Sequence, residues 1–175
     1  VHPQLDGGVR EVLTVHGALS SRTTSGGTAP ALVAQQIKEA LNEKFVSIAK
    51  QDVTFQNILL KHQGKKILID IWASWCRDCV VTLPELKKLQ QENPTVHFVF
   101  ISLDKSKERW IRSIDRLKIK GDHYYMAEGK KGAFGKFLGL WWIPRYVVVD
   151  EFGEIVVFKA TKITDKNILK ALKIE

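Results

Sequence analysis

Apolar and polar residues follow different patterns in the first and the later parts of the chain. Residues 1–27 hold two Gly-Gly pairs and a run of Ser and Thr, a composition typical of loops, with room for one short strand at residues 9–16. Thr28 can cap a helix and Pro30 suits a first helical turn, and apolar residues then recur at helical spacing. We therefore expect a loop followed by a helix.

After this helix the chain alternates between strand-like and helix-like patterns. Apolar runs rich in β-branched residues predict strands at residues 65–72, 95–103, 124–126, 146–149 and 155–158, with a weaker edge strand at 45–49. Helical spacing predicts helices at residues 54–60, 76–92, 105–117, 132–138 and 164–172. This order indicates an α/β fold in which helices flank a sheet. We expect residues 44–175 to form this domain, with residues 1–43 as an N-terminal extension packed on it.

Both cysteines lie where a predicted strand meets a predicted helix. Free backbone N–H groups and the positive end of the helix dipole point at the first side chain of such a helix, so they favour negative charge on Cys76. We expect Cys76 to be a nucleophile with a lowered pKa. Cys79 follows three residues later on the same helix face, and this spacing lets its sulfur resolve a mixed disulfide formed at Cys76.

A carboxylate, Asp70, interrupts the apolar strand before the cysteines. Burial of a charge without a partner is costly, so a buried Asp70 would have a raised pKa and could take and return the proton of Cys79. The alternative is a solvated aspartate at a sheet edge.

Other uses of the two cysteines are a structural disulfide or half of a metal site. A four-ligand zinc site needs a second Cys or His pair nearby, and the sequence has none at a suitable spacing. The five histidines are dispersed, and we expect them to be structural or exposed. We therefore expect no metal and no cofactor.

Composition restricts the class of protein and its partners. The chain has 175 residues, 45% of them hydrophobic and 26% charged, as in ordinary soluble globular proteins. No apolar run is long enough to span a membrane and the only methionine is Met126, so we expect a processed or excised piece whose signal or anchor segment is missing. The formal net charge of +8 could indicate nucleic acid, an anionic membrane or acidic partner proteins. Because the lysines are scattered in pairs, we interpret the positive charge as a solvated lysine-rich surface. The alternative is a preference for acidic partner proteins, and we expect no nucleic acid.

Two motifs resemble those of a known family. Trp75-Cys76-x-x-Cys79 follows a buried strand, with an aspartate six residues before the first cysteine. About 65 residues later, Trp-Ile-Pro-Arg leads from Trp142 into another apolar strand. Together they resemble thioredoxin over residues 50–175. The sequence Trp-Ala-Ser-Trp-Cys around Cys76 and Thr-Leu-Pro-Glu-Leu from Thr82 are typical of the extracytoplasmic TlpA/ResA-like branch.

This resemblance implies a thioredoxin-like fold, with a central mixed sheet flanked by helices and an added strand and helix between residues 117 and 140. It implies a cis peptide bond before Pro144, which exposes the backbone of Ile143 to pair with an extended substrate. The residues expected to contact substrate are Trp75, Arg77, Trp142, Ile143, Pro144 and Arg145. One departure is Thr82, because many members of this branch have a glutamate there, and its loss gives more weight to Asp70.

The resemblance also implies an enzyme, a thiol-disulfide oxidoreductase that exchanges disulfides with protein substrates, apocytochromes c of cytochrome c maturation among them. The resemblance favours reduction of the substrate disulfides. The opposing charges of Arg77 and Asp78 by themselves leave open whether the protein reduces or oxidises its substrates. The expected location is the periplasm or another extracytoplasmic compartment, with a redox partner that resets the dithiol. The alternative is a thioredoxin-like binding or metal-chaperone module without turnover, although a copper chaperone would have three residues between its cysteines.

Overall fold

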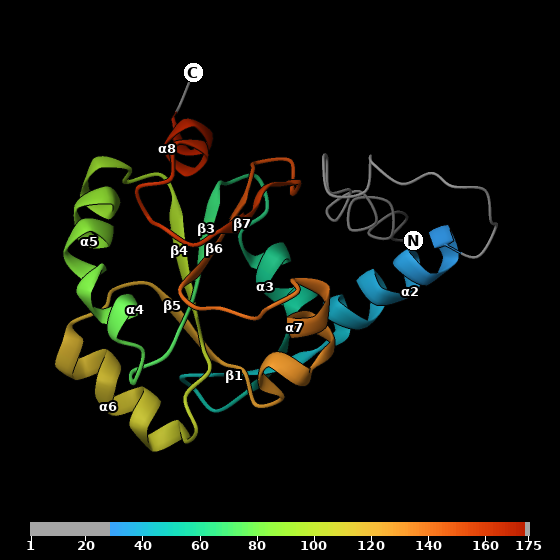
Figure 1. Cartoon of the computed structure of the whole chain (residues 1–175), viewed down its shortest axis with the longest axis horizontal. Coiled ribbons are helices and arrows are strands. Elements are labelled where there is room, and N and C mark those ends of the chain that lie inside the picture. The colour runs from blue at the N-terminus through green and yellow to red at the C-terminus, as the bar shows by residue number, and fades with distance from the viewer. Residues whose placement is uncertain (1–28, 174–175) are drawn as a thin grey trace, which may run out of the picture.

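The most apolar segments of the chain form the middle of one sheet. The structure is a computed structural model and describes residues 29–173 (Figure 1). Strands β3 (Ile67–Trp72), β4 (His97–Ser102) and β6 (Arg145–Val149) are almost completely buried, as expected for strands covered on both faces. The other strands are β1 (Lys44–Ser47), β2 (Asp52–Thr54), β5 (Asp122–Tyr125) and β7 (Ile155–Ala160).

The seven strands form a single mixed sheet in the order β2-β1-β5-β4-β3-β6-β7. Strand β4 is parallel to both β3 and β5, and the remaining neighbours are antiparallel. Parallel neighbours need a crossover, and the helices between β3, β4 and β5 supply it. The predicted mixed sheet flanked by helices is therefore confirmed.

Helices cover the two faces of this sheet. They are α2 (Ala29–Asn42), α3 (Phe55–Lys61), α4 (Arg77–Val81), α5 (Leu83–Glu92), α6 (Lys107–Leu117), α7 (Ala133–Phe137) and α8 (Lys166–Leu172), with a 3₁₀ turn, η1, at Gly129–Lys131. In Figure 1, α4, α5 and α6 lie on one side of the sheet, and α2, α3 and α7 lie on the other. Helix α8 contacts β6 and β7.

Local sequence signals determine where two of these helices begin. At the start of α3, Thr54 Oγ1 accepts a hydrogen bond from the backbone N–H of Asn57, and the Asn57 side chain accepts one from the Thr54 N–H. This reciprocal pair is a capping box. Ser106 Oγ accepts from the Arg109 N–H at the start of α6.

Two predictions about elements are wrong. Residues 45–49 were expected at an edge of the sheet, but β1 pairs with both β2 and β5, and the short strand β2 takes the edge. The expected continuous helix at residues 76–92 is interrupted at Thr82, because Pro84 near the start of α5 has no N–H to donate to the preceding turn.

The N-terminal extension is described only from residue 29. The loop expected at residues 1–27, its strand at 9–16 and the Thr28 cap lie outside the described residues. The last turn of α2 buries Ala40 and Leu41 in the main core, which agrees with a helix packed on the domain. Over residues 29–173, no helix combines the length and apolar character needed to cross a membrane.

Candidate active site

The two cysteines lie at the start of α4, directly after β3 and a short loop. Cys76 is the N-cap residue of α4, and its Sγ accepts a hydrogen bond from the backbone N–H of Cys79 at 3.1 Å. The two sulfurs are joined in a disulfide. Cys76 is 7% exposed and Cys79 is 2% exposed, so the first sulfur is the more accessible one. An N–H aimed at Cys76 Sγ would stabilise its thiolate after reduction.

A buried carboxylate, Asp104, holds the loop that leads to the cysteines. It accepts hydrogen bonds from the Ser74 backbone N–H at 3.1 Å and from the Ser74 hydroxyl at 2.6 Å. The Ser102 hydroxyl donates to the same carboxylate at 2.8 Å. Asp104 was not predicted from the sequence as a site residue. Its position just after β4 was the available signal, because the carboxyl ends of the parallel neighbours β3 and β4 lie together at one edge.

The proline turn lies against the outer sulfur. The Ile143–Pro144 peptide bond is cis, as predicted. Cys76 Sγ is 3.8 Å from the carbonyl oxygen of Ile143, although 67 residues separate them in the sequence. The two motifs identified in the sequence therefore meet in space at one site.

Asp70 lies in the middle of β3 and is 2% exposed, so the alternative of a solvated edge aspartate is wrong. Burial raises the pKa of its carboxyl to about 8. Its Oδ1 atom has no hydrogen-bond partner among the described residues. A buried carboxyl of this kind is protonated over part of the neutral range and can exchange a proton there.

Tyr146, on β6, lies directly opposite Asp70 in the sheet register. Its hydroxyl is 3.3 Å from Thr82 Oγ1, which also donates to the carbonyls of Asp78 and Cys79. Burial, followed by the negative charge of Asp70, raises the pKa of Tyr146. This tyrosine was not predicted as a site residue, because the strand pairing that brings it to Asp70 is not visible in one sequence.

A hollow of about 370 Å³ opens beside Cys76. Trp75 and Trp142, which line it, are 54% and 47% exposed, which is unusual for such large apolar side chains. Trp141, not singled out in the sequence, is 72% exposed. The residues that line the hollow are Trp75, Cys76, Arg77, Asp78, Lys130, Trp141, Trp142 and Ile143.

The predicted position of Arg145 at this groove is wrong. Arg145 is only 1% exposed, and its guanidinium donates to the carbonyls of Leu138 and Gly139. It instead lines a second hollow, of about 500 Å³, that shares Trp141 and Trp142 with the first. Because β6 alternates its side chains, the residue after Pro144 turns away from Cys76.

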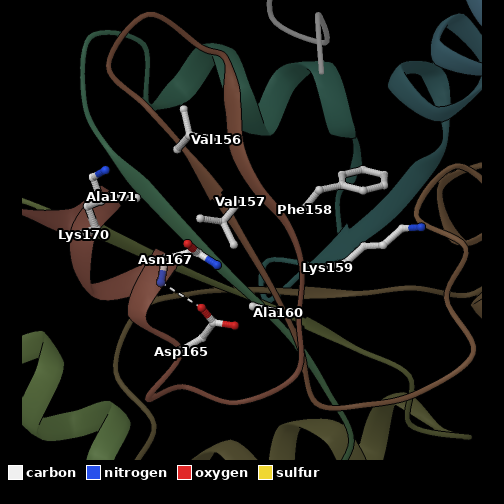
Figure 2. A pocket seen from close by; sticks show the side chains of 9 residues that line it. All are labelled: Val156, Val157, Phe158, Lys159, Ala160, Asp165, Asn167, Lys170 and Ala171. Atoms are coloured by element: carbon white, nitrogen blue, oxygen red, sulfur yellow. Dashed lines mark hydrogen bonds between the residues drawn. The ribbon is translucent and has the colours of Figure 1, made fainter. Parts of the chain in front are cut away.

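A third hollow, of about 580 Å³, lies between β7 and α8 (Figure 2). Its polar groups include Asp165 and Asn167, and Asp165 Oδ1 caps α8 by accepting from the Asn167 N–H at 2.8 Å. Neither cysteine lines it. Among the described residues, no three His, Cys, Asp or Glu side chains gather closely enough to hold a metal ion.

Comparisons with known proteins agree with this geometry. A family model described as thioredoxin-like matches residues 64–155, more than half of the chain. The thiol:disulfide interchange protein DsbE of Haemophilus influenzae is 28% identical over 153 residues, which cover 87% of this chain and 81% of that protein. The solution structure of a candidate thiol-disulfide oxidoreductase from Bacteroides vulgatus is 29% identical, with a TM-score of 0.61 over 74% of this chain and 82% of that one.

A separate match has a different character. A stretch of 37 residues is 60% identical to argininosuccinate lyase of Mycobacterium sp. (strain JLS), and it covers 21% of this chain but only 8% of that enzyme. So short a stretch does not show a shared family. The match over residues 64–155 includes both cysteines and Pro144, and the chain therefore belongs to the thioredoxin-like family, in which its expected identity as a thiol-disulfide oxidoreductase is confirmed.

Proposed function

We propose that this protein is a reductase, which passes two electrons from the dithiol of Cys76 and Cys79 to disulfides of extracytoplasmic proteins. The observation that supports this most strongly is the position of Cys76 Sγ. It accepts a backbone N–H at the start of α4 and lies 3.8 Å from the Ile143 carbonyl. The same sulfur is thus prepared as a thiolate and located where an extended client could pair with the backbone.

The first step forms a mixed disulfide. The Cys76 thiolate attacks one sulfur of the client disulfide, so that a bond forms between Cys76 Sγ and that sulfur. The client S–S bond breaks, and the second client sulfur leaves as a thiolate that takes a proton from water. Cys76 suits this role because it is the more exposed of the two cysteines.

The second step releases the client. Cys79 gives its proton to the carboxylate of Asp70, and the resulting thiolate attacks Cys76 Sγ. A bond forms between Cys76 and Cys79, the bond to the client breaks, and the client leaves with its second thiolate. The dithiol is then oxidised and the client has gained two electrons. The raised pKa of Asp70 supports this role, since a carboxyl with an ordinary pKa would be a poor proton acceptor from a thiol.

The client would be held by backbone pairing and by the exposed side chains around Cys76. The Ile143 carbonyl, beside Pro144, offers a hydrogen-bond acceptor at the edge of the hollow. Trp75 and Trp142 offer apolar contact, which suits an extended polypeptide. Arg77 adds a positive charge next to the attacking sulfur.

The family resemblance also supports a proposal for the redox partner and the location of this protein. We infer that a redox partner reduces the disulfide again after each turnover, since each turnover leaves Cys76 and Cys79 oxidised. The TlpA/ResA-like resemblance supports an extracytoplasmic location, and residues 44–175 suffice in this proposal for the chemistry. Residues 1–43 then serve as an extension.

Two cysteine variants test the proposal. Cys76→Ser should abolish the reduction of insulin disulfides, because no sulfur remains at the outer position. Cys79→Ser should still attack but should accumulate mixed disulfides with clients, because the second step is lost. Activity in Cys76→Ser equal to that of the parent would contradict the proposal. If the parent protein binds clients but shows no turnover, this result would support the alternative of a binding module.

A further inference from the structure

The second hollow, which shares the tryptophan pair with the first, is lined by two cationic side chains and by no carboxylate. It is lined by Trp141, Trp142, Arg145, Lys159 and Thr161. The two tryptophans also line the hollow at Cys76, and their ring centres are 6.1 Å apart. The pair is therefore shared by both hollows, and an extended client bound at Cys76 could reach the second hollow across it.

Arg145 brings a buried positive charge to this hollow without a carboxylate to balance it. Its guanidinium bonds are to backbone carbonyls, at 2.9 Å to Leu138 and 3.4 Å to Gly139, and its Nε atom has no partner among the described residues. No described ion pair includes Arg145. A buried cation whose contacts are all neutral gains much from an approaching anion, because little water screens their attraction.

Lys159 adds a second cation at the mouth of the same hollow. Figure 2 shows its side chain extending away from Asp165, and no described ion pair includes it. Thr161 contributes a hydroxyl to the lining. At the first hollow, Arg77 and Lys130 outnumber the single carboxylate of Asp78. The two hollows together thus combine exposed aromatic rings with a surplus of positive charge.

We propose that the second hollow is a client subsite for a carboxylate side chain, so that the preferred disulfide substrates are polypeptides with Asp or Glu near a cysteine. This inference rests on the proposed reductase function and specifies its substrate class. The carboxylate would pair with the exposed Lys159, and the buried positive charge of Arg145 would attract it from beneath the lining, while Trp141 and Trp142 contact the adjoining apolar part of the client. An ammonium is suited to a carboxylate, and the buried guanidinium adds to the attraction at longer range.

The test compares the reduction of disulfide peptides that differ at one position. Glu, Gln or Lys is placed in turn at successive positions on either side of one cysteine, and kcat/KM is measured with the full chain at low and at high salt. At the best position, the peptide with Glu should be reduced about three-fold faster than the peptide with its neutral isostere Gln, which is the effect of one partly exposed ion pair. The peptide with Lys should be reduced more slowly than both. High salt should remove the difference.

Variants then locate the effect. Lys159→Gln should abolish the advantage of Glu over Gln through a higher KM for the Glu peptide. Lys162→Gln, at an exposed lysine just after β7 that does not line the hollow, should leave that advantage unchanged. Because Arg145 is buried and its replacement could prevent folding, Trp141→Ala serves as the second variant and should weaken all three peptides. Reduction of hydroxyethyl disulfide, too small to reach the second hollow, should be the same in Lys159→Gln and Lys162→Gln as in the parent.

The outcomes separate this inference from the proposed function. Equal rates for the Glu, Gln and Lys peptides would overturn the subsite while leaving the reductase intact. A preference for Glu that survives in Lys159→Gln would overturn the assignment to this hollow. Failure of the parent to reduce any peptide or hydroxyethyl disulfide would instead overturn the proposed function.

Discussion

Asp70→Asn should stabilise the folded protein at neutral pH and slow the release of the client. Asp70 is buried in β3, and its pKa in the folded protein, about 8, lies well above the ordinary value of 3.8. The folded state therefore binds the proton more tightly than the unfolded state. Between these two pKa values, a rise in pH removes the proton from the unfolded chain first, so the stability of the fold falls as the pH rises.

The size of this effect follows from the pKa difference. One pH unit in this window costs about 1.4 kcal/mol, so at pH 7 the penalty from Asp70 is about 4 kcal/mol. Asn has nearly the same shape and no charge, so the variant should lack this pH dependence. Because the unpartnered Oδ1 position stays polar in Asn, part of the gain will be lost, and we expect about 2–3 kcal/mol at pH 7.

Denaturant unfolding of the reduced protein across this pH range measures the stability, and single-turnover reduction of a disulfide peptide measures the two chemical steps. The attack by Cys76 should be unchanged, while the resolution by Cys79 should slow. A matched control is Asp104→Asn, at a carboxylate that is also buried but accepts hydrogen bonds from Ser74 and Ser102, and this variant should be less stable than the parent. An Asp70→Asn variant that is no more stable at pH 7 and resolves mixed disulfides at the parent rate would show that Asp70 neither destabilises the fold nor accepts the proton of Cys79.

Three further outcomes are expected. The thiol of Cys76 in the reduced protein should titrate below the roughly 8.5 of a free cysteine, because the Cys79 N–H and Arg77 favour its thiolate, and thiolate absorbance against pH checks this. Asp104→Ala should lower the stability by about 3 kcal/mol and slow the first attack, since the Ser74 loop loses its anchor, as denaturant unfolding and stopped-flow reduction would show. A chain that begins at Thr28 should keep full reductase activity, and a folded truncation with lost activity would show that residues 1–27 contribute to the chemistry.

Sequence patterns were sufficient for the centre of the fold and for the main site. The strands β3, β4 and β6 are buried on both faces, so their apolar runs are long and unambiguous. Cys76 and Pro144 could be identified because each lies in a short motif at the end of such a strand. A carboxylate inside an apolar strand was equally visible, and Asp70 is buried with a raised pKa as expected.

Features that depend on pairing between distant segments were not predictable. The neighbours of β1 are set by a sheet register that no local pattern encodes, which is why an interior strand was expected at the edge. Tyr146 meets Asp70, and Asp104 meets Ser74, only because strands that are distant in the sequence pair in the sheet. The buried position of Arg145 was also hidden, because an arginine in a sequence is expected at the surface unless its backbone acceptors are known.

The reduction potential of the Cys76–Cys79 pair decides whether this protein acts as a reductase. It is measured by equilibrating the protein with glutathione or dithiothreitol buffers of known ratio and determining the fraction of dithiol. We predict a potential more negative than about −200 mV, in the range of proteins that reduce disulfides, because a dithiol in that range gives its electrons to client disulfides. A value near −120 mV, typical of a strong oxidant, would contradict the assignment of this protein as a reductase.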